Sequence, residues 1–325
     1  MCKINDVALM SRLIINKSSQ LDTPELKKMF IIAMASVPEP SQKEKELALK
    51  EIEKPYDKRD MQKIISNNRI KINKQEFFKL LKLNYEKDGT IYNRYRRLFD
   101  KLVKSTHYDF DKDDDFMSGF FFTKVVAYGN YFTITVDPDF MPIFWSLKGG
   151  YVKLLTEDVA GFDSKFTMDL YKFLMGMNNY KEVNLTTKQL KMIFGLSEND
   201  YMKNNHRFDR YNFEKYTLNR ALKELDEKCK SITIIKQIDE NNKTVDFLKV
   251  KENKKVKYYN IKYFVTDPYQ IVNQEKQTQT TIDDFMSDQE FPRSRTKSGR
   301  LQRSRHIQLQ RIEEINQNLY NWLEE

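Results

Sequence analysis

The stretch VNLTTKQLKMIFGL, residues 183–196, decides the fold because its hydrophobic period changes in the middle. It opens with two alternating apolar residues, as a short strand does, and takes helical spacing after the capping residue Thr186. The stretch IKINKQEFFKLLKL, residues 70–83, repeats this change after Asn73. The chain therefore contains one module twice. The matching apolar pairs are Ile70 and Val183, Ile72 and Leu185, Phe77 and Leu190, Leu80 and Ile193, and Leu83 and Leu196.

Both copies continue in the same order. A helix capped by Thr23 or Ser164 precedes the repeated stretch, and an amphipathic helix follows it, at 90–105 in the first copy and within 210–229 in the second. Strand patterns come next, with turns at Gly129-Asn130 and Asn241-Asn242. The apolar stripes of the later helices are Ile91, Tyr95, Leu98 and Leu102, and Leu218, Leu222, Leu225 and Cys229. Three helices followed by a hairpin is the winged-helix order.

We therefore predict an α+β protein with two tandem winged-helix domains and a flexible basic C-terminal tail that ends in an amphipathic helix. The first domain takes residues 1–155, the second 156–268, and the tail 269–325. The capping box SQKE at 41–44 predicts a charged helical insertion over 38–68. The tail is polar and mostly without period until its last helix, whose apolar side is Leu309, Ile312, Ile315, Leu319, Trp322 and Leu323.

Composition narrows the class of protein. Of the 325 residues, 40% are hydrophobic, which is enough for folded cores, and a net charge of +9 suits a polyanionic partner. Cys2 and Cys229 are too far apart in sequence to predict a metal site or a disulfide framework. No long apolar run or signal-peptide cleavage site is evident, so we expect a cytoplasmic protein.

The outward faces of the two amphipathic helices are the candidate functional surface. Arg, Lys and Asn grip phosphates or read guanine and adenine edges in a major groove. A solvated helix face is the alternative for either helix alone, and the presence of two such helices favours DNA binding. The predicted DNA-binding residues are Asn93, Arg94, Arg96, Arg97, Lys101 and Lys104 in the first copy, and Lys203, Arg207, Arg210, Lys215, Tyr216, Asn219, Arg220 and Lys223 in the second.

The predicted second wing, KVKENKKVK at 249–257, adds Lys254 and Lys255 as candidate phosphate contacts, with a solvated loop as the alternative. The acidic stretch DFDKDDDF at 109–116 lacks the glycine and terminal Glu of a calcium loop, so we expect a solvated turn ahead of a strand.

Catalytic motifs do not emerge from the sequence. It has no nucleotide-binding phosphate loop, and its three histidines lack the paired spacing of a metal-dependent nuclease. We expect no enzymatic activity, no cofactor and no metal site.

The tail carries two further patterns. The basic run at 293–305 suits nonspecific DNA affinity, with a disordered charged tail as the alternative. QTTIDDFM, residues 279–286, has the glutamine, aliphatic and aromatic spacing of sliding-clamp-binding peptides, a short pattern that also arises by chance.

Residues 5–267 resemble the plasmid replication initiators with tandem winged helices, the family of RepE, RepA and Pi. The stretches that carry the resemblance are FDSKFTMDLYKFLM, LTTKQLKMIFGL, Tyr201, RYNFEKYTLNRALKEL and the connecting GNYFTITVDPDFMPIFWSLKGGYVKLL. The family's basic residues after the helix-opening aromatic, here Phe213, fall on Lys215 and Tyr216. Glu214 stands where a basic residue is frequent.

The resemblance implies a function. Members bind directly repeated sites, called iterons, in double-stranded DNA at a plasmid origin, open the adjacent duplex, and recruit the host initiator and replicative helicase. It also implies a monomer-dimer equilibrium in which dimers repress their own promoter. The alternatives are a winged-helix transcriptional regulator without origin function, a rolling-circle nicking enzyme, and a protein-interaction scaffold.

Overall fold

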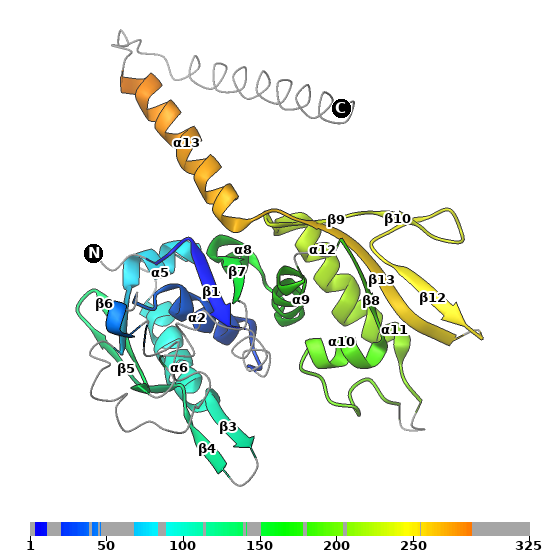
Figure 1. Ribbon diagram of the computed structural model, residues 1–325, viewed down its shortest axis with the longest axis horizontal. Helices are drawn as coiled ribbons and strands as arrows, with labels where there is room; N and C mark the ends of the chain where they lie inside the picture. Colours follow the sequence, from blue (N-terminus) through cyan, green and yellow to red (C-terminus); the bar gives the residue numbers. More distant parts are fainter. Residues whose placement is uncertain are drawn as a thin grey trace. The chain divides into compact units, whose positions relative to one another are not determined.

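The computed structural model of the chain describes residues 4–11, 21–38, 41–44, 46, 68–83, 89–112, 115–138, 141, 151–177, 181–203, 207–253 and 255–287. Two compact units divide the chain, Met1–Gln274 and Glu275–Glu325. Figure 1 labels the elements along the chain.

In the first half of the larger unit, the helices that pack beneath the sheet are α2 (Pro24–Ala35), α5 (Lys74–Leu80) and α6 (Gly89–Ser105). Two of the predicted caps are confirmed. The hydroxyl of Thr23 accepts a hydrogen bond from the Leu26 N–H at 3.3 Å, and Asn73 accepts from the first two free N–H groups of α5. Helix formation at these positions is thus determined locally, by cap and apolar period together.

A three-stranded antiparallel sheet covers these helices, in the order β2 (Arg69–Asn73), β6 (Tyr131–Val136), β5 (Phe122–Tyr128). The predicted turn between β5 and β6 is confirmed, with Gly129 at φ +52, a left-handed conformation that glycine adopts without steric cost. The core beneath the sheet is aromatic, and Phe132 lies 4.6 Å from Phe99 between ring centroids. Phe99 is buried although it was not part of the predicted apolar stripe.

The acidic stretch at 109–116 is not the turn that the sequence predicts. β3 (His107–Lys112) pairs with β4 (Asp115–Phe120) as an antiparallel hairpin, and Asp109 and Asp111 lie within the ladder. The reason is the alternation of aromatic and acidic residues from Tyr108 onward, which has the period of a strand and outweighs the acidic composition.

The second half repeats the order of the first. Its helices are α9 (Lys165–Gly176), α10 (Thr187–Ile193), and a continuous helix formed by α11 (Arg210–Phe213), the π-helical turn η3 (Glu214–Leu218) and α12 (Asn219–Lys228). The predicted cap at Thr186 is confirmed as a full capping box with Gln189. The repeat is confirmed as well, because β8 (Glu182–Leu185) precedes α10 as β2 precedes α5.

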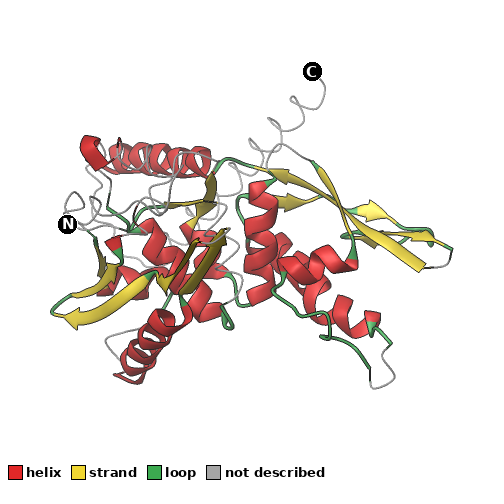
Figure 2. Ribbon diagram, turned by 60° about the horizontal axis from the view of Figure 1, so that its bottom comes forward, coloured by secondary structure: helices red, strands yellow, loops and turns green. Residues whose placement is uncertain are grey.

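The sheet of this half is built on the long strand β13 (Lys255–Val265), which pairs with β12 (Leu248–Glu252), β8 and β9 (Ile232–Ile234). In Figure 2 the β12–β13 hairpin projects away from the helices. The predicted turn at Asn241-Asn242 is confirmed, closing the short ladder of β10 (Gln237–Ile238) with β11 (Thr244–Val245).

Two elements join the halves. β1 (Val7–Ser11) pairs with β7 (Tyr151–Leu155), and α8 (Thr156–Gly161) follows directly. Asp158 of α8 accepts hydrogen bonds from the backbone N–H groups of Lys230 and Ser231, just after α12. Cys229, predicted as a core residue, is half-buried beside this carboxylate, and burial followed by the charge of Asp158 raises the pKa of its thiol.

Helix α2 packs against α6, α8 and α9, so one hydrophobic core is shared by both halves. A buried charge cluster lies in this core. The ammonium of Lys27 on α2 is 2.7 Å from both carboxylate oxygens of Asp169 on α9, and Lys172 reaches the same carboxylate at 2.9 Å. All three side chains have no exposed surface.

The prediction of a flexible tether after residue 268 was wrong for its first twenty residues. They form helix α13 (Pro268–Ser287), preceded by Asp267, whose side chain accepts a hydrogen bond from the Tyr269 N–H. Ile271 and Val272 pack against Val7 and Leu155, and this tertiary contact supplies the apolar surface that the polar sequence lacks.

Three predictions fall largely outside the described residues. In the insertion, Ser41 and Glu44 form the predicted capping box, and most of 38–68 is not described. The basic run at 293–305 and the last amphipathic helix are not described at all. Among the described residues, no helix has the length and apolarity needed to cross a membrane.

Candidate nucleic-acid interface

The helix of residues 210–228 buries the predicted apolar stripe and exposes the predicted polar face. Leu218, Leu222 and Leu225 are fully buried. The residues predicted to point outward, namely Tyr216, Asn219, Arg220 and Lys223, are all exposed, as is Lys215 on the flank. The orientation of this helix is therefore confirmed residue by residue.

The exposed cations differ in how firmly they are held. Lys223 lies 3.6 Å from Glu227, an exposed pair that holds the side chain only weakly. Lys215 lies over the rings of Tyr211 and Tyr216, 5.6 and 5.2 Å from their centroids. Arg220 forms no ion pair within the part of the chain that the structure describes. Its guanidinium is available to an incoming anion.

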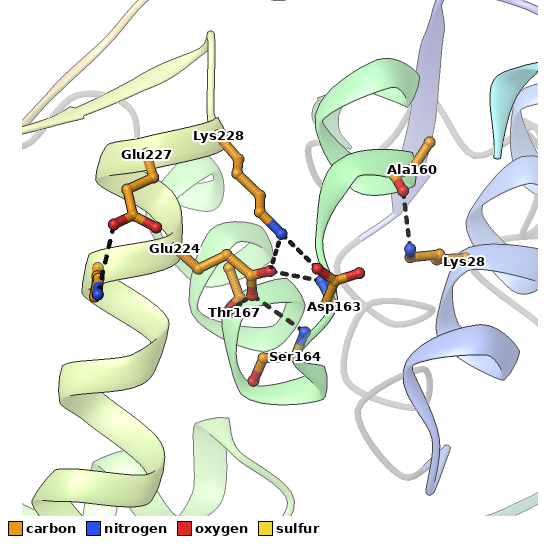
Figure 3. Close-up of polar contacts among 9 residues, drawn as sticks. Lys28, Ala160, Asp163, Ser164, Thr167, Glu224, Glu227 and Lys228 are labelled. Carbon is orange, nitrogen blue, oxygen red and sulfur yellow. Dashed lines mark hydrogen bonds and ion pairs between the residues drawn. The ribbon is translucent and has the colours of Figure 1, made fainter. Parts of the chain in front are cut away.

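Figure 3 shows how the opposite side of α12 is anchored to the start of α9. The carboxylate of Glu224 accepts hydrogen bonds from the N–H groups of Asp163 and Ser164, at 2.6 and 3.1 Å, and from the Thr167 hydroxyl at 2.5 Å. Ser164 was predicted to cap α9, but its side chain makes no capping bond. Instead, a carboxylate from another helix binds the N–H groups of the two residues that precede α9.

Lys228 completes this anchor by bridging Asp163 at 2.5 Å and Glu224 at 3.0 Å. Burial opposes ionisation of Glu224, but the hydrogen bonds from Thr167, the Asp163 N–H and Lys228 outweigh it and lower the pKa of the carboxyl. The hydrogen bond to Asp163 raises the pKa of Lys228. Asp163, Glu224 and Lys228 are therefore all charged at neutral pH, and their contacts hold α12 against the start of α9.

The segment before α11 folds back on itself. Met202 and Phe208 form an antiparallel bridge, and the N–H of Lys203 donates to the carbonyl of Arg207 at 2.8 Å. Lys203 also lies 3.6 Å from Asp209. Lys203 and Arg207 are exposed, whereas Arg210 is half-buried and its Nε has no hydrogen-bond partner within the described chain. Of the three predicted phosphate contacts here, Arg210 is the least accessible.

Helix α6 carries the corresponding face of the first half. The predicted residues Asn93, Arg94, Arg96, Arg97, Lys101 and Lys104 are all exposed. Two of them are tied to acids that flank the start of α2, since Arg94 lies 2.6 Å from Glu25 and Lys101 3.9 Å from Asp22. Arg96, Arg97 and Lys104 form no ion pair with any described residue. These three are the free cations of α6.

The lysines of the β12–β13 hairpin are mostly paired. Lys249 lies 2.6 Å from Glu214, Lys251 lies 3.3 Å from Glu240, and Lys257 lies 3.1 Å from Glu252. Lys255, one of the two predicted contacts, is exposed and forms no ion pair among the described residues. Lys254 lies outside the described residues.

Sequence reasoning missed the part that Glu214 plays. It was noted only as an acid at a position where a basic residue is frequent, but its side chain is 7% exposed and contacts Lys249 and Tyr259. The signal in the sequence is that Glu214 is the single acid in the first half of this helix, residues 210–219.

A solved structure shares the fold. The crystal structure of Pi initiator protein in complex with iteron DNA aligns with a TM-score of 0.56 at 15% identity, covering 82% of this chain and 99% of that chain. Domains 2 and 3 of RctB align with a TM-score of 0.39 at 12% identity, over 68% of this chain and 80% of that chain. Among curated protein sequences, none matches this chain.

The model of one protein family matches residues 11–175, about half of the chain, and it describes the first winged helix (WH1) of initiator replication proteins. The matched range contains α2, α5, α6 and the β5–β6 hairpin, and it ends within α9. The chain is a replication initiator of the Initiator Replication protein WH1 family.

Proposed function

We propose that this initiator binds direct repeats (iterons) in double-stranded DNA at the origin of a plasmid or related mobile element. The observation that carries the proposal is that two helices in corresponding places of the repeat, α6 and α11–α12, both expose basic and amide side chains. A single basic helix face is common on protein surfaces, whereas two at equivalent positions fit two successive major-groove contacts. The fold shared with the Pi initiator, which was solved on iteron DNA, agrees with this.

Under this proposal the larger unit consists of two tandem winged-helix domains, residues 1–155 and 156–268. The first contains α2, α5 and α6 with the strand pair β5–β6, and the second contains α9, α10 and α11–α12 with the strand pair β12–β13. The strand preceding α5 or α10 completes the sheet in each case. The boundary falls between β7 and α8.

The side chains divide into two roles. Asn219, Arg220, Arg96 and Arg97 have the chemistry to read base edges, because amide and guanidinium groups make paired hydrogen bonds to adenine and guanine. Lys203, Arg207, Lys215, Lys223 and Lys255, together with Lys254, would position the phosphate backbone. These contacts are electrostatic, so the affinity should fall steeply with salt.

The later steps follow from the family. Bound protein would open the adjacent duplex and recruit the host initiator and the replicative helicase, without covalent chemistry or a cofactor of its own. A monomer-dimer equilibrium would let the dimer repress its own promoter. The stretch 279–286 would offer a contact to a sliding clamp, and the protein would work in the cytoplasm on plasmid DNA.

Nuclease footprinting of the purified protein on the DNA flanking its gene, at two salt concentrations, tests the proposal. Protection of several repeats in the same orientation, weakening steeply with salt, is the expected result. One palindromic footprint over the promoter would instead favour a transcriptional regulator. Metal-dependent nicking of supercoiled origin DNA would favour a rolling-circle enzyme, and absent or salt-insensitive binding would favour a scaffold.

A further inference from the structure

Glu214 is a buried acid at the centre of the surface proposed to read DNA. It begins the π-helical turn between α11 and α12, and its neighbours Lys215 and Tyr216 are exposed. A buried carboxylate is costly unless it is paired and hydrogen-bonded, so its partners explain why it is held there.

Its two oxygens have different partners on the β12–β13 hairpin. Oε2 lies 2.6 Å from the ammonium of Lys249 on β12, and Oε1 accepts a hydrogen bond of 3.0 Å from the hydroxyl of Tyr259 on β13. Tyr259 is fully buried and also shares a hydrogen bond with Thr187, the first residue of α10. One carboxylate thereby joins the proposed reading helix to both strands of the wing, and Tyr259 extends the contact to α10.

The helix is adapted to this contact. At the π-helical turn the Asn219 N–H donates to the carbonyl of Glu214, five residues back, and the hydroxyl of the buried Thr217 donates to the carbonyl of Phe213 at 2.6 Å. A side chain that enters the hydrogen-bond ladder is a known cause of such local widening, and π turns occur often at functional sites. The distortion lies directly between the aromatic start of the helix and the segment that exposes Asn219, Arg220 and Lys223.

The surrounding charges keep the contact intact at neutral pH. The groups that face Glu214 are Lys249 and Tyr259, and Arg210 is near enough to act on Tyr259. Burial, together with the carboxylate of Glu214, raises the pKa of Tyr259, so its hydroxyl remains a donor. Lys249 is 41% exposed, but its charge is committed to Glu214 and is not offered to phosphate.

We propose that Glu214 is a positioning residue that locks the wing to the reading helix through Lys249 and Tyr259, so that the two elements meet DNA as one rigid surface. This inference rests on the proposed function. It predicts that breaking the lock lowers discrimination between DNA sequences without lowering affinity for DNA in general, because the basic surface stays and only its alignment is lost.

The test measures affinity for a repeat-containing duplex and for a scrambled duplex over a range of salt, for the full chain and Glu214→Gln. The amide keeps the shape and an acceptor for Tyr259 but loses the charge. We expect the ratio of specific to nonspecific affinity to fall about tenfold, as for one misplaced base contact. The salt slope of nonspecific binding should steepen by about 0.9, because Lys249 is released to phosphate.

Glu252→Gln is the matched control. Like Glu214→Gln, it removes one carboxylate charge that pairs with a lysine of the wing, here Lys257, but Glu252 lies on β12 and pairs only within the hairpin. It should steepen the salt slope and leave the affinity ratio unchanged. Equal ratios for Glu214→Gln and Glu252→Gln would overturn the positioning role while leaving the proposed function standing. No preference of the wild-type protein for the repeat would overturn both.

Two more variants keep the inference testable if Glu214→Gln does not fold. Tyr259→Phe removes only the hydroxyl and should lower the affinity ratio without changing the salt slope. Lys249→Met should lower the ratio of specific to nonspecific affinity as much as Glu214→Gln does. The variant that carries both changes should lower this ratio no further than either single change. Additive losses would show that the two residues act independently, which would refute the lock.

Discussion

Asp169→Asn tests whether the two halves of the larger unit depend on the buried charge cluster at their shared core. The Asp169 carboxylate holds Lys27 of α2 through two contacts of 2.7 Å and Lys172 of its own helix at 2.9 Å, all without exposed surface. Removing the carboxylate's charge leaves two buried ammonium groups without this partner. Breaking a buried pair in this way costs about 3 to 5 kcal/mol.

The expected loss in the free energy of unfolding can be measured as a shift of the urea midpoint. With a urea m value of about 3 kcal/mol per M, a loss of about 4 kcal/mol lowers the unfolding midpoint by about 1.3 M. Far-UV circular dichroism of the wild-type and variant chains in urea at pH 7 provides the assay, and an unchanged m value would show that the loss is one of stability.

Glu157→Gln is the matched control, because Glu157 forms a 2.7 Å pair with Lys230 on the surface. An exposed pair contributes about 0 to 1 kcal/mol, so its midpoint should hardly move. If Asp169→Asn unfolds at the same urea concentration as Glu157→Gln, the buried cluster does not stabilise the shared core and the reasoning is refuted.

Three further predictions concern charge and recognition. Burial, followed by the charge of Lys172, lowers the pKa of Lys27 to about 8 from its ordinary 10.5. Between these two pH values the unfolded chain binds more protons than the folded chain, so the free energy of unfolding rises with pH. Urea unfolding should show the wild type gaining about 2 kcal/mol more stability than Lys27→Met from pH 7.5 to 9.5, and equal gains would contradict this. Glu224→Gln should cost about 1 to 2 kcal/mol in thermal unfolding, since it weakens the hydrogen bonds that join α12 to the start of α9, and a melting temperature equal to that of the wild type would exclude this role. Asn219→Ala, Arg220→Ala and Arg97→Ala should each weaken specific binding by about 1 to 3 kcal/mol in titrations that leave nonspecific binding unchanged, and equal losses on both DNAs would mean that the side chain contacts only phosphate.

The sequence by itself determined the elements and their outward faces. The change of period at 70–83 and 183–196 located two strand-helix pairs, and the caps at Thr23, Asn73 and Thr186 lie where it predicted them. Both basic faces are exposed as predicted. A helix cap and an apolar period both involve residues within about one turn of each other, so both can be recognised in the sequence alone.

Only the tertiary structure decided which charges are available on those faces. The sequence shows Lys249, Lys254 and Lys255 as equivalent wing lysines, but Lys249 is engaged by Glu214 from a helix 35 residues away. It likewise predicted Ser164 as the cap of α9, but the Ser164 side chain makes no capping bond, and its N–H donates to Glu224, 60 residues away.

Helix α13 is a further element that the local sequence did not predict. Its polar sequence predicts a tether, and the packing of its Ile271 and Val272 on Val7 and Leu155 depends on strands β1 and β7, which are far from it in the sequence. A helix with few apolar residues is stabilised mainly by the apolar surface against which it packs. Ion pairs and hydrogen bonds between residues far apart in the sequence likewise depend on distances in space, and no local sequence pattern encodes those distances.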